Sequence, residues 1–356
     1  MTGSARSDQR GTDRQPGATS DRDEFARLTD PFRRELLAHC YRMLGSADDA
    51  EDLVQETYLR AWRAYTRFEG RASLRTWLYR IATNVCLTAL ERRGRRPLPS
   101  GLGGPSADPE GPLAYGAEVP WLQPMPAALL TAASADPAGI VASRQGMRLA
   151  LVAAMQHLPA RQRAVLILRD VLTWRADEVA ELLGTTTTAV NSVLQRARAQ
   201  LREVAPSEEE IAEPDDPSQR ALLDRYTAAF ESTDLAALLK LLADDVVLEM
   251  PPYATWFAGR ATIGRFLAQR SFDPAAKFDN ADKFRLVTTA ANGQLAVAVY
   301  LRDEDALHRA HMVQVLSFAA GRISRIVAFL DPGLFPLFGL PQVCPATVGG
   351  PPAARR

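Results

Sequence analysis

The chain has 356 residues, more than one typical domain requires, so two or three domains are expected. Its hydrophobic fraction of 47% is ordinary for a globular chain, and no apolar run is long enough to predict a membrane-spanning helix. The 42 Lys and Arg residues balance the 42 Asp and Glu residues, so net charge alone does not indicate a nucleic-acid binder.

The N-terminal part of the sequence predicts a tail followed by helices. Residues 1–23 are polar and lack the apolar core of a signal peptide, so a disordered tail is expected. Residues 24–96 show helical spacing of apolar residues. Gly45 is expected to end one helix, and Ser46 to cap the next, whose first turn is rich in aspartate.

Charge is unevenly distributed along the chain. Between Arg60 and Arg96 there are ten arginines and only two acidic residues, Glu69 and Glu91. Acidic residues gather elsewhere, in "SADDAEDLVQE" and in "SEEEIAEPDDP". A local basic field of this kind is what a phosphate backbone attracts, so the distribution favours nucleic-acid binding where the net charge does not.

The middle of the chain reads as a linker, a second helical block and a hinge. Residues 97–137 are rich in Pro and Gly, and their apolar stretch "EVPWLQPMPAALL" predicts a segment that docks on another surface. Residues 138–204 are helical again, and residues 205–217 form an acidic, proline-bearing hinge. Cys40, Cys86 and Cys344 have no paired spacing, so free thiols and no metal site are expected.

The second helical block contains a pattern typical of a helix-turn-helix. Val179 and Leu182 face inward on a short helix, Gly184 permits a sharp turn, and Thr186 or Thr187 can cap the helix that follows. Polar residues on the outer face of that second helix can donate to base edges and phosphates in a major groove. The alternative is an ordinary surface helix with charged flanks.

Residues 218–340 change from helical to strand-like spacing, which predicts a separate α+β domain, and residues 341–356 form a flexible tail. Two sets of side chains can line and polarise a cavity there: the aromatic residues Tyr226, Tyr253, Trp256, Phe257 and Phe329, and the polar residues His308, His311, Glu249 and Asp331. General acid/base chemistry is one interpretation. The other is an aromatic core with histidines that serve no catalysis.

Both helical blocks resemble the extracytoplasmic-function (group IV) sigma factors of bacterial RNA polymerase. "DDAEDLVQETYLRAW" and "FEGRASLRTWLYRIATNVCL" resemble the second conserved sigma region, and "LPARQRAVLILRDVLTWRADEVAELLG" with "AVNSVLQRARAQL" resembles the fourth. "WLQPMP" and "AANGQLAVAVYL" are similar to motifs of sigma factors with a fused SnoaL-like domain. The resemblance implies two all-α domains, the second a helix-turn-helix, followed by a cone-shaped α+β barrel of the SnoaL-like (NTF2-like) type.

The resemblance also implies partners for the first helical block. The acidic amphipathic helix is expected to bind core RNA polymerase, at the β′ clamp helices, through Asp49, Asp52, Leu53, Gln55, Glu56 and Leu59. Trapping a melted −10 element requires aromatic rings for stacking and arginines for the backbone. The expected −10 residues are Arg71, Ser73, Arg75, Trp77, Tyr79, Arg80, Asn84, Arg92 and Arg93. Trp77 and Tyr79 are equally compatible with a place in the core.

The helix-turn-helix is expected to read the −35 element of promoter DNA and to contact the polymerase β flap. Its expected DNA-binding residues are Thr186, Thr187, Thr188, Asn191, Ser192, Gln195, Arg196 and Arg198. The linker between the two blocks is expected to run through the polymerase near the nascent RNA. A cytoplasmic, non-enzymatic factor without cofactor follows from the resemblance, and an anti-sigma partner is compatible with it.

The C-terminal domain is expected to tune sigma activity by folding back on the promoter-binding half or by touching polymerase. Two other classes of function remain open on the sequence. One is a helix-turn-helix regulator fused to a SnoaL-like enzyme that processes a small molecule. The other is an operator-binding repressor, which needs no polymerase to bind DNA.

Overall fold

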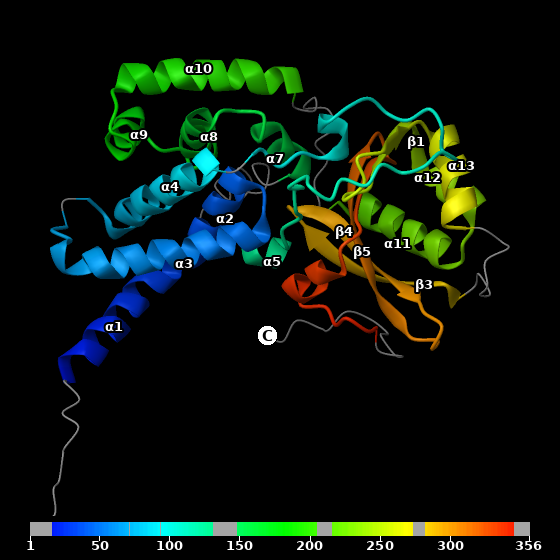
Figure 1. The fold of residues 1–356 in the computed structure, drawn as a ribbon, viewed down its shortest axis with the longest axis horizontal. Coiled ribbons are helices and arrows are strands. Elements are labelled where there is room, and N and C mark those ends of the chain that lie inside the picture. The colour runs from blue at the N-terminus through cyan, green and yellow to red at the C-terminus, as the bar shows by residue number, and fades with distance from the viewer. Residues whose placement is uncertain are drawn as a thin grey trace, which may run out of the picture.

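The computed structural model describes residues 16–70, 72–92, 94–130, 148–204, 216–272 and 282–344. Helices occupy one half of the molecule and a sheet with its own helices occupies the other, and a connecting segment runs between them (Figure 1). We refer to residues 16–92 as the N-terminal helical domain, residues 94–130 as the connecting segment, residues 148–204 as the helix-turn-helix domain, and residues 216–344 as the C-terminal domain.

The N-terminal helical domain consists of α1 (Pro16–Thr29), α2 (Arg33–Leu44), α3 (Ala47–Ala64) and α4 (Leu74–Arg92). Helix α1 begins at Pro16, so residues 16–23 are helical and the expectation of a disordered tail is wrong for them. Gly45 ends α2 in the left-handed region at φ 70°, and the Ser46 side chain caps α3 by accepting from Asp49 N at 3.2 Å. Both end signals predicted from the sequence are confirmed.

The helix-turn-helix domain contains α7 (Leu149–Met155), α8 (Ala160–Leu166), a π-helical turn (Ile167–Val171), α9 (Ala176–Leu183) and α10 (Thr187–Val204). Gly184 ends α9 at φ 61°, as predicted. Thr186 begins α10 by accepting from Ala189 N at 3.2 Å. The inward face of α10 is apolar and buried at Val190 and Leu194, because these positions recur at helical spacing.

The C-terminal domain is the expected α+β unit. Its helices are α11 (Pro217–Glu231), α12 (Leu235–Leu241) and α13 (Arg260–Arg270). Its strands are β1 (Leu242–Glu249), β2 (Trp256–Ala258), β3 (Phe284–Ala291), β4 (Gln294–Arg302), β5 (His308–Ala319) and β6 (Arg322–Phe329). They form one sheet in the order β2-β1-β6-β5-β4-β3, in which only β1 and β6 pair in parallel among the described residues.

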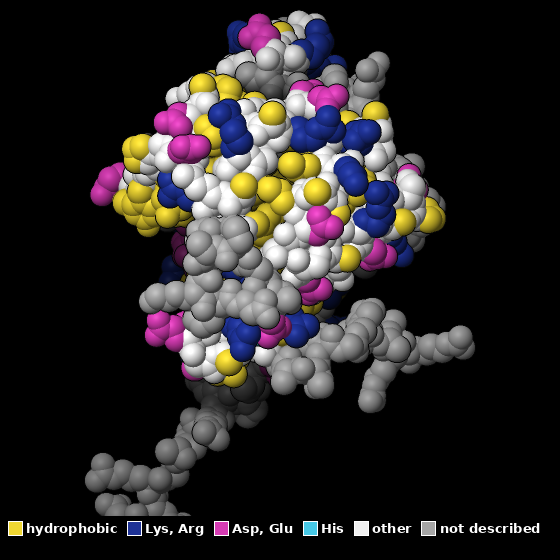
Figure 2. All heavy atoms as spheres, turned by 90° about the vertical axis from the view of Figure 1, so that its right-hand side faces the viewer, with side chains coloured by type: hydrophobic (Ala, Val, Ile, Leu, Met, Phe, Trp, Pro, Cys, Tyr) yellow, Lys and Arg dark blue, Asp and Glu magenta, His cyan; other side chains and the backbone are white. Residues whose placement is uncertain are grey.

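Both faces of this sheet are covered. Alternate residues of β4, such as Val297 and Val299, pack with the domain's own helices. The intervening residues Ala296 and Ala298 share a core with the rest of the chain, including Met125 of the connecting segment and Leu149 of α7. Figure 2 shows the end of the molecule opposite the helical half, where charged side chains of both signs are scattered among hydrophobic ones. The face of the sheet that carries Ala296 and Ala298 therefore packs against the helical half of the molecule.

The described part of the connecting segment is ordered against its neighbours. It contains a 3-10 helix (Pro99–Gly101) and the short helix α5 (Ala127–Leu130). Gly116 N donates to Pro252 O at 2.9 Å, and Gln123 N donates to Gly45 O at 3.0 Å. The segment thus touches both the C-terminal domain and the N-terminal helical domain, as the apolar stretch in its sequence predicted.

The C-terminal domain also continues past residue 340, where the sequence predicted a flexible tail. Ala310 N donates to Gln342 O at 2.8 Å, and Cys344 N donates to His308 O at 2.7 Å. A 3-10 helix (Pro332–Phe338) precedes this stretch, and its Phe335 is fully buried beside Tyr300, with ring centroids 4.9 Å apart. The expected boundary is therefore wrong for residues 341–344, because they add a strand-like edge to β5.

Candidate nucleic-acid interface

The residues expected to bind core polymerase lie on α3. Asp52, Gln55 and Leu59 are exposed, and Leu59 retains 51% of its accessible surface. Leu53 and Glu56 are half-buried, and Glu56 Oε1 accepts from Arg60 Nε at 2.6 Å one helical turn later. An acidic face with an exposed leucine is thus open to solvent on this helix.

Side chains of the connecting segment cover the first turn of α3. Asp49 pairs with Arg96 at 2.5 Å, and these two side chains are 15% and 19% exposed. Gln123 donates from Nε2 to Asp48 Oδ2 at 3.0 Å and accepts at Oε1 from Ser46 Oγ at 2.7 Å. Asp49 is therefore already neutralised by Arg96, the last arginine of the basic stretch, and a partner that binds Asp49 has to displace Arg96.

The residues expected to bind the −10 element lie on and just before α4. Ser73 Oγ accepts from Thr76 N at 3.1 Å and so caps the helix. Trp77 is half-buried, with its ring 4.8 Å from that of Phe68. The exposed members of the set are Ser73, Arg80, Asn84 and Arg92. Arg71 and Arg93 lie outside the described residues.

Two residues assigned to the −10 surface face the helix-turn-helix domain instead. Tyr79 is fully buried, so a role in stacking on a DNA base is not possible in this arrangement. Its ring centroid lies 5.2 Å from that of Trp174, in the loop before α9. Arg75 forms a two-pronged ion pair with Glu35, at 2.9 Å from Nε and 2.8 Å from Nη2 to Oε2. Burial, together with the nearby Glu35 carboxylate, raises the pKa of the Tyr79 phenol above its usual range.

This contact corrects the sequence reading of α4. A place in the core was one of the two readings of Tyr79 in the sequence, and the structure shows that one. For Arg75 the sequence gave no sign of a partner, since Glu35 and Trp174 lie far away along the chain. The Arg75 guanidinium lies 5.0 Å from the Tyr79 ring centroid and 5.8 Å from that of Trp174, which suits a cation–π interaction. The helix-turn-helix domain therefore covers part of the face of α4 that was assigned to DNA.

The residues expected to read the −35 element all lie on an open surface of α9–α10. Thr186, Thr187, Thr188, Asn191, Ser192, Gln195, Arg196 and Arg198 are each exposed. Arg198 is held by Asp170, at 2.7 Å from Nη2 to Oδ1, which fixes the direction of its guanidinium. Figure 1 shows α10 running along the outer edge of the molecule. The polar face of this helix is thus open to solvent in the described structure.

A buried arginine fastens the helix-turn-helix domain to the N-terminal helical domain. Arg163 on α8 is 3% exposed. It donates to Met43 O of α2, and within its own domain to Gln156 Oε1 at 2.8 Å and to Leu158 O at 3.1 Å. Burial lowers the pKa of this guanidinium to about 10. Its positive charge meets neutral oxygens rather than a carboxylate, so the docked arrangement carries an electrostatic cost.

Four residues join three parts of the chain in a buried network. The Tyr41 hydroxyl of α2 donates to Gln123 O at 2.8 Å and accepts from Asn292 Nδ2 at 2.7 Å. Asn292 Oδ1 accepts from Met125 N at 2.9 Å, and Asn292 N donates to Met125 O at 2.8 Å. The two loop motifs noted in the sequence, "WLQPMP" and the Asn-Gly turn, therefore contact each other and α2.

Two of the side chains offered as cavity lining, Glu249 and Trp256, hold the connecting segment. Glu249 is fully buried; its Oε1 accepts from Ser100 N at 2.8 Å, and its Oε2 pairs with Arg325. Trp256 Nε1 donates to Gly103 O at 2.8 Å. These side chains, which the sequence offered as the lining of a cavity, are used to fix residues 100–103 against the sheet.

The polar groups that suited the acid/base interpretation each have a different partner or position in the domain. His308 Nε2 lies 3.0 Å from Asp282 O, and His311 sits at the irregular position between β4 and β5, where the register shifts. Asp331 caps the following 3-10 helix by accepting from Gly333 N at 2.8 Å. Inside the domain, Tyr226 donates to Gln314 Oε1 at 2.8 Å, which is a neutral pair. Among the described residues, no cluster of His, Cys, Asp and Glu fits a metal ion.

Sequence reasoning missed the residues that hold the domains together. Glu35, Trp174 and Arg163 carry no local signal, because each resembles an ordinary helix or loop residue until its distant partner is known. Gln123 and Asn292 lie in stretches that the sequence did mark, one in the apolar linker segment and one in "AANGQLAVAVYL". None of the described helices is long and apolar enough to cross a bilayer.

Comparisons with known proteins agree with this architecture. Residues 28–96 match the family model of Sigma-70 region 2, residues 148–201 that of Sigma-70 region 4, and residues 223–326 that of the SnoaL-like domain. The chain is 55% identical to the ECF RNA polymerase sigma factor SigG of Mycobacterium tuberculosis over 324 residues, which cover 90% of this chain and 85% of SigG.

Two further proteins are similar to this chain, one in sequence over a shorter stretch and one in fold. SigW of Bacillus subtilis is 38% identical over 73 residues, 20% of this chain and 39% of SigW. The fold resembles the crystal structure of the M. tuberculosis sigma factor SigJ, with a TM-score of 0.55, 22% identity, and coverage of 90% of this chain and 99% of SigJ. The identity with SigG over most of both chains, together with the three family models, shows that this protein belongs to the extracytoplasmic-function sigma factors and carries a fused SnoaL-like domain.

Proposed function

We propose that this sigma factor recognises promoters through two separate surfaces, α10 for the −35 element and α4 for the −10 element. The observation that carries the proposal is the open polar face of α10, where every residue assigned to the −35 element is exposed. Arg196 and Arg198 supply phosphate contacts, and Asn191 and Gln195 are suited to base edges. On α4, Arg80, Asn84 and Arg92 are accessible in the same way.

Core polymerase binding is assigned to α3. Its Asp52, Gln55 and Leu59 combine exposed charge with an exposed apolar side chain, which suits a basic amphipathic partner. The family resemblance implies the β′ clamp helices as this partner and the β flap as the partner of the helix-turn-helix domain. The factor then acts where polymerase acts, in the cytoplasm, without catalysis or cofactor of its own, and an anti-sigma factor can add a further level of control.

The C-terminal domain is proposed to hold the factor in a closed state. Tyr41, Gln123 and Asn292 tie α2, the connecting segment and the C-terminal domain together. In the same arrangement Trp174 covers Tyr79 and Arg75 on α4, and Arg96 covers Asp49 on α3. Release of these contacts exposes both the DNA-binding and the polymerase-binding residues, so the C-terminal domain modulates initiation.

The sigma activity is tested by reconstitution with core polymerase. Full-length protein is mixed with core enzyme on promoter fragments, including the region upstream of its own gene, and run-off transcripts and permanganate-reactive thymines near the −10 site are measured. We expect transcripts and open DNA only when both proteins are present. A footprint on DNA without core enzyme, accompanied by a block of transcription, indicates the repressor instead.

The closed state is tested by a variant of the buried network. Asn292→Gly removes the amide and keeps the positive φ of 55° acceptable. We expect it to raise core affinity and run-off yield, while Ala306→Gly, in an exposed turn at φ 64°, serves as the matched control. If Asn292→Gly and Ala306→Gly leave core affinity and transcription equally unchanged, the regulatory role of this domain is contradicted.

The enzyme alternative is less well supported by the geometry. The interior of the C-terminal domain holds the neutral pair Tyr226–Gln314, and its histidines lie elsewhere. A turnover assay of the full-length protein with small-molecule substrates of SnoaL-like enzymes decides the matter, since any multiple turnover that Tyr226→Phe abolishes assigns catalysis to this interior.

A further inference from the structure

An ion pair links the π-helical turn (Ile167–Val171) to the polar face of α10. Asp170 belongs to this turn, and Arg198 lies 28 residues later on α10. Arg198 Nε donates to Asp170 Oδ2 at 2.9 Å, and Arg198 Nη2 donates to Asp170 Oδ1 at 2.7 Å. The carboxylate and the guanidinium therefore meet edge to edge through two hydrogen bonds, the geometry that fixes an arginine side chain most firmly.

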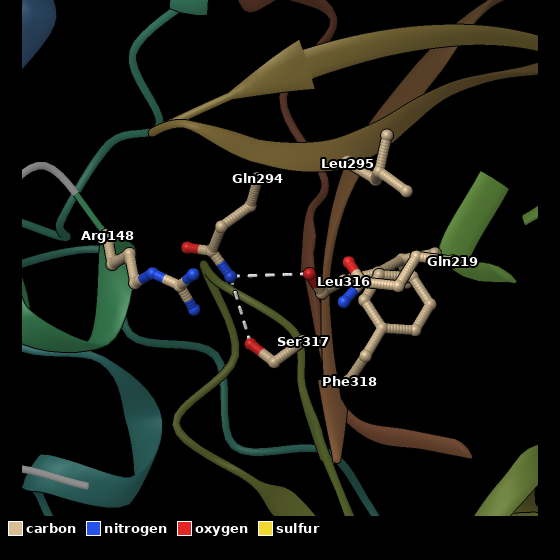
Figure 3. A pocket seen from close by; sticks show the side chains of 7 residues that line it. All are labelled: Arg148, Gln219, Gln294, Leu295, Leu316, Ser317 and Phe318. Carbon is tan, nitrogen blue, oxygen red and sulfur yellow. Dashed lines mark hydrogen bonds between the residues drawn. The ribbon is translucent and has the colours of Figure 1, made fainter. Parts of the chain in front are cut away.

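The pair lies entirely within the helix-turn-helix domain. The contacts that dock this domain on the C-terminal domain are different, since they cross between the two. Gln294 of β4 donates from Nε2 to Ser317 Oγ at 3.0 Å (Figure 3) and accepts at Oε1 from Leu149 N of α7 at 2.9 Å. Release of the domain breaks the bond to Leu149 and leaves the pair of Asp170 and Arg198 intact. The pair is therefore present when α10 meets DNA, whichever state the domain is in.

The pair is not needed to hold the π-helical turn against α10. Its two side chains are 49% exposed for Arg198 and 29% exposed for Asp170, and ion pairs open to water contribute little to stability. Ile167 and Leu168 of the turn are fully buried in the same core as the inward face of α10. Apolar packing thus joins the two elements, which leaves the direction of the Arg198 guanidinium as the property that Asp170 controls.

Asp170 also places a negative charge where the rest of the surface is neutral or basic. Helix α10 has no acidic residue between Thr187 and Arg202. A carboxylate beside a DNA-binding face repels phosphates, so Asp170 opposes binding unless its effect on Arg198 offsets the repulsion. Arg196, two residues earlier, is exposed and forms no ion pair with the described residues. The two arginines therefore differ, because the charge of Arg196 is open and that of Arg198 is compensated.

We propose that Asp170 is a positioning residue for −35 recognition, which holds Arg198 so that the free edge of its guanidinium meets one DNA phosphate in a fixed direction. A guanidinium has five N–H donors; Asp170 takes two from Arg198, and the others face away from the carboxylate. Phosphate contacts set the register of a recognition helix, and base contacts discriminate only in the correct register. Asp170 thereby supports sequence discrimination without touching DNA. This inference rests on the proposed function of α10.

The experiment measures discrimination and charge separately. Full-length protein is bound to core polymerase, and its affinity is measured by fluorescence anisotropy across a salt series. The two DNA fragments are the promoter upstream of its own gene and the same promoter with a scrambled −35 region. Asp170→Asn keeps the shape of the side chain and removes its charge. We expect the ratio of the two affinities to fall about fivefold or more, while the slope of log affinity against log salt steepens by about one, because the charge of Arg198 is no longer compensated.

Arg198→Lys separates the geometry from the charge. Lysine keeps the positive charge but lacks the planar fork, so the ratio of affinities should fall about fivefold with an unchanged salt slope. The matched controls are Asp244→Asn and Arg260→Lys, which make the same two substitutions in an ion pair of the C-terminal domain. Both controls should keep the wild-type ratio and slope. Urea unfolding of each variant shows that folded proteins are compared, and Arg198→Lys carries the test if Asp170→Asn does not fold.

The outcomes separate this inference from the proposed function. Unchanged discrimination in both Asp170→Asn and Arg198→Lys overturns the positioning role, even if the salt slope of Asp170→Asn steepens. An equal loss of discrimination in Asp244→Asn overturns it as well. If the wild-type complex binds intact and scrambled −35 regions equally, or if Arg196→Ala leaves its salt slope unchanged, the assignment of α10 to the −35 element is itself wrong, and the positioning role fails with it.

Discussion

The indole of Trp174 lies against the phenol ring of Tyr79, with centroids 5.2 Å apart, and both rings are almost completely buried. Trp174 belongs to the helix-turn-helix domain, and Tyr79 belongs to the helix assigned to the −10 element. The contact therefore joins the two DNA-binding modules of the sigma factor and hides part of one of them. A promoter complex that uses the buried face of α4 requires this contact to open.

Trp174→Ala is expected to open the two modules. Loss of a buried tryptophan costs about 3–5 kcal/mol, so the free energy of unfolding measured with urea falls by an amount of that order. At the same time the affinity for core polymerase and promoter, measured by fluorescence anisotropy, is expected to rise. Trp62→Ala is the control for loss of an indole, because Trp62 is 36% exposed on α3 and its ring packs against Phe25 of α1, with centroids 5.3 Å apart. A fall in stability with unchanged affinity contradicts the masking role of Trp174.

Arg196→Ala is expected to weaken promoter binding by the polymerase complex. Arg196 is exposed on the outer face of α10, so removal of one phosphate contact reduces the slope of log affinity against log salt by about one. The salt series is measured with labelled promoter DNA. Arg260→Ala in the C-terminal domain, where Arg260 pairs with Asp244, is the matched control and keeps the wild-type slope. If the two variants have identical slopes, the assignment of α10 to the DNA interface is contradicted.

Tyr41→Phe is expected to loosen the junction of α2, the connecting segment and the C-terminal domain. The change removes a hydroxyl that donates to Gln123 O and accepts from Asn292 Nδ2, and leaves buried partners unpaired at a cost of about 1–3 kcal/mol. Hydrogen exchange at the Met125 amide, which donates to Asn292 Oδ1, should accelerate. Tyr226→Phe removes a hydroxyl within the C-terminal domain alone and should leave that exchange rate unchanged; equal acceleration in both variants argues against a specific junction.

His39 is expected to make stability depend on pH. Its pKa is lowered to about 3 by burial and then by Arg42, from an ordinary value of 6.5. The unfolded chain therefore takes up a proton that the folded chain does not, so stability is lost as the pH falls below about 6.5, by up to about 1.4 kcal/mol per pH unit until the folded pKa is reached.

The measurement is urea unfolding at several pH values between about 7 and 4.5, a window that begins above the ordinary pKa of 6.5 and ends above the folded pKa of about 3. His39→Gln keeps a hydrogen-bonding group near Thr83 Oγ1, which lies 3.0 Å from His39 Nε2, and should flatten the pH dependence. His157→Gln, at a more exposed position, should retain most of the pH dependence of the free energy of unfolding. An undiminished slope in His39→Gln assigns the effect to other groups.

Local features of the fold were readable in the sequence because they depend on neighbouring residues. The ends of α2 and α9 follow from Gly45 and Gly184, which reach positive φ without strain, and the start of α3 follows from the Ser46 cap. The outward face of α10 follows from helical periodicity, since Val190 and Leu194 had to face inward. These are relations between residues a few positions apart, so no tertiary structure was needed.

Which of the chemically suitable side chains are free for DNA or polymerase was decided only by the tertiary structure. Arg75, Arg80 and Arg92 look alike in the sequence, yet Arg75 is committed to Glu35 and the Trp174 ring while the others are exposed. Likewise, Glu249 looked like a cavity group and instead holds Ser100. The sequence by itself determined the modules, their order and their family; the fold decided which surfaces those modules keep covered, because a side chain's electrostatic partner and its burial depend on segments tens to hundreds of residues away.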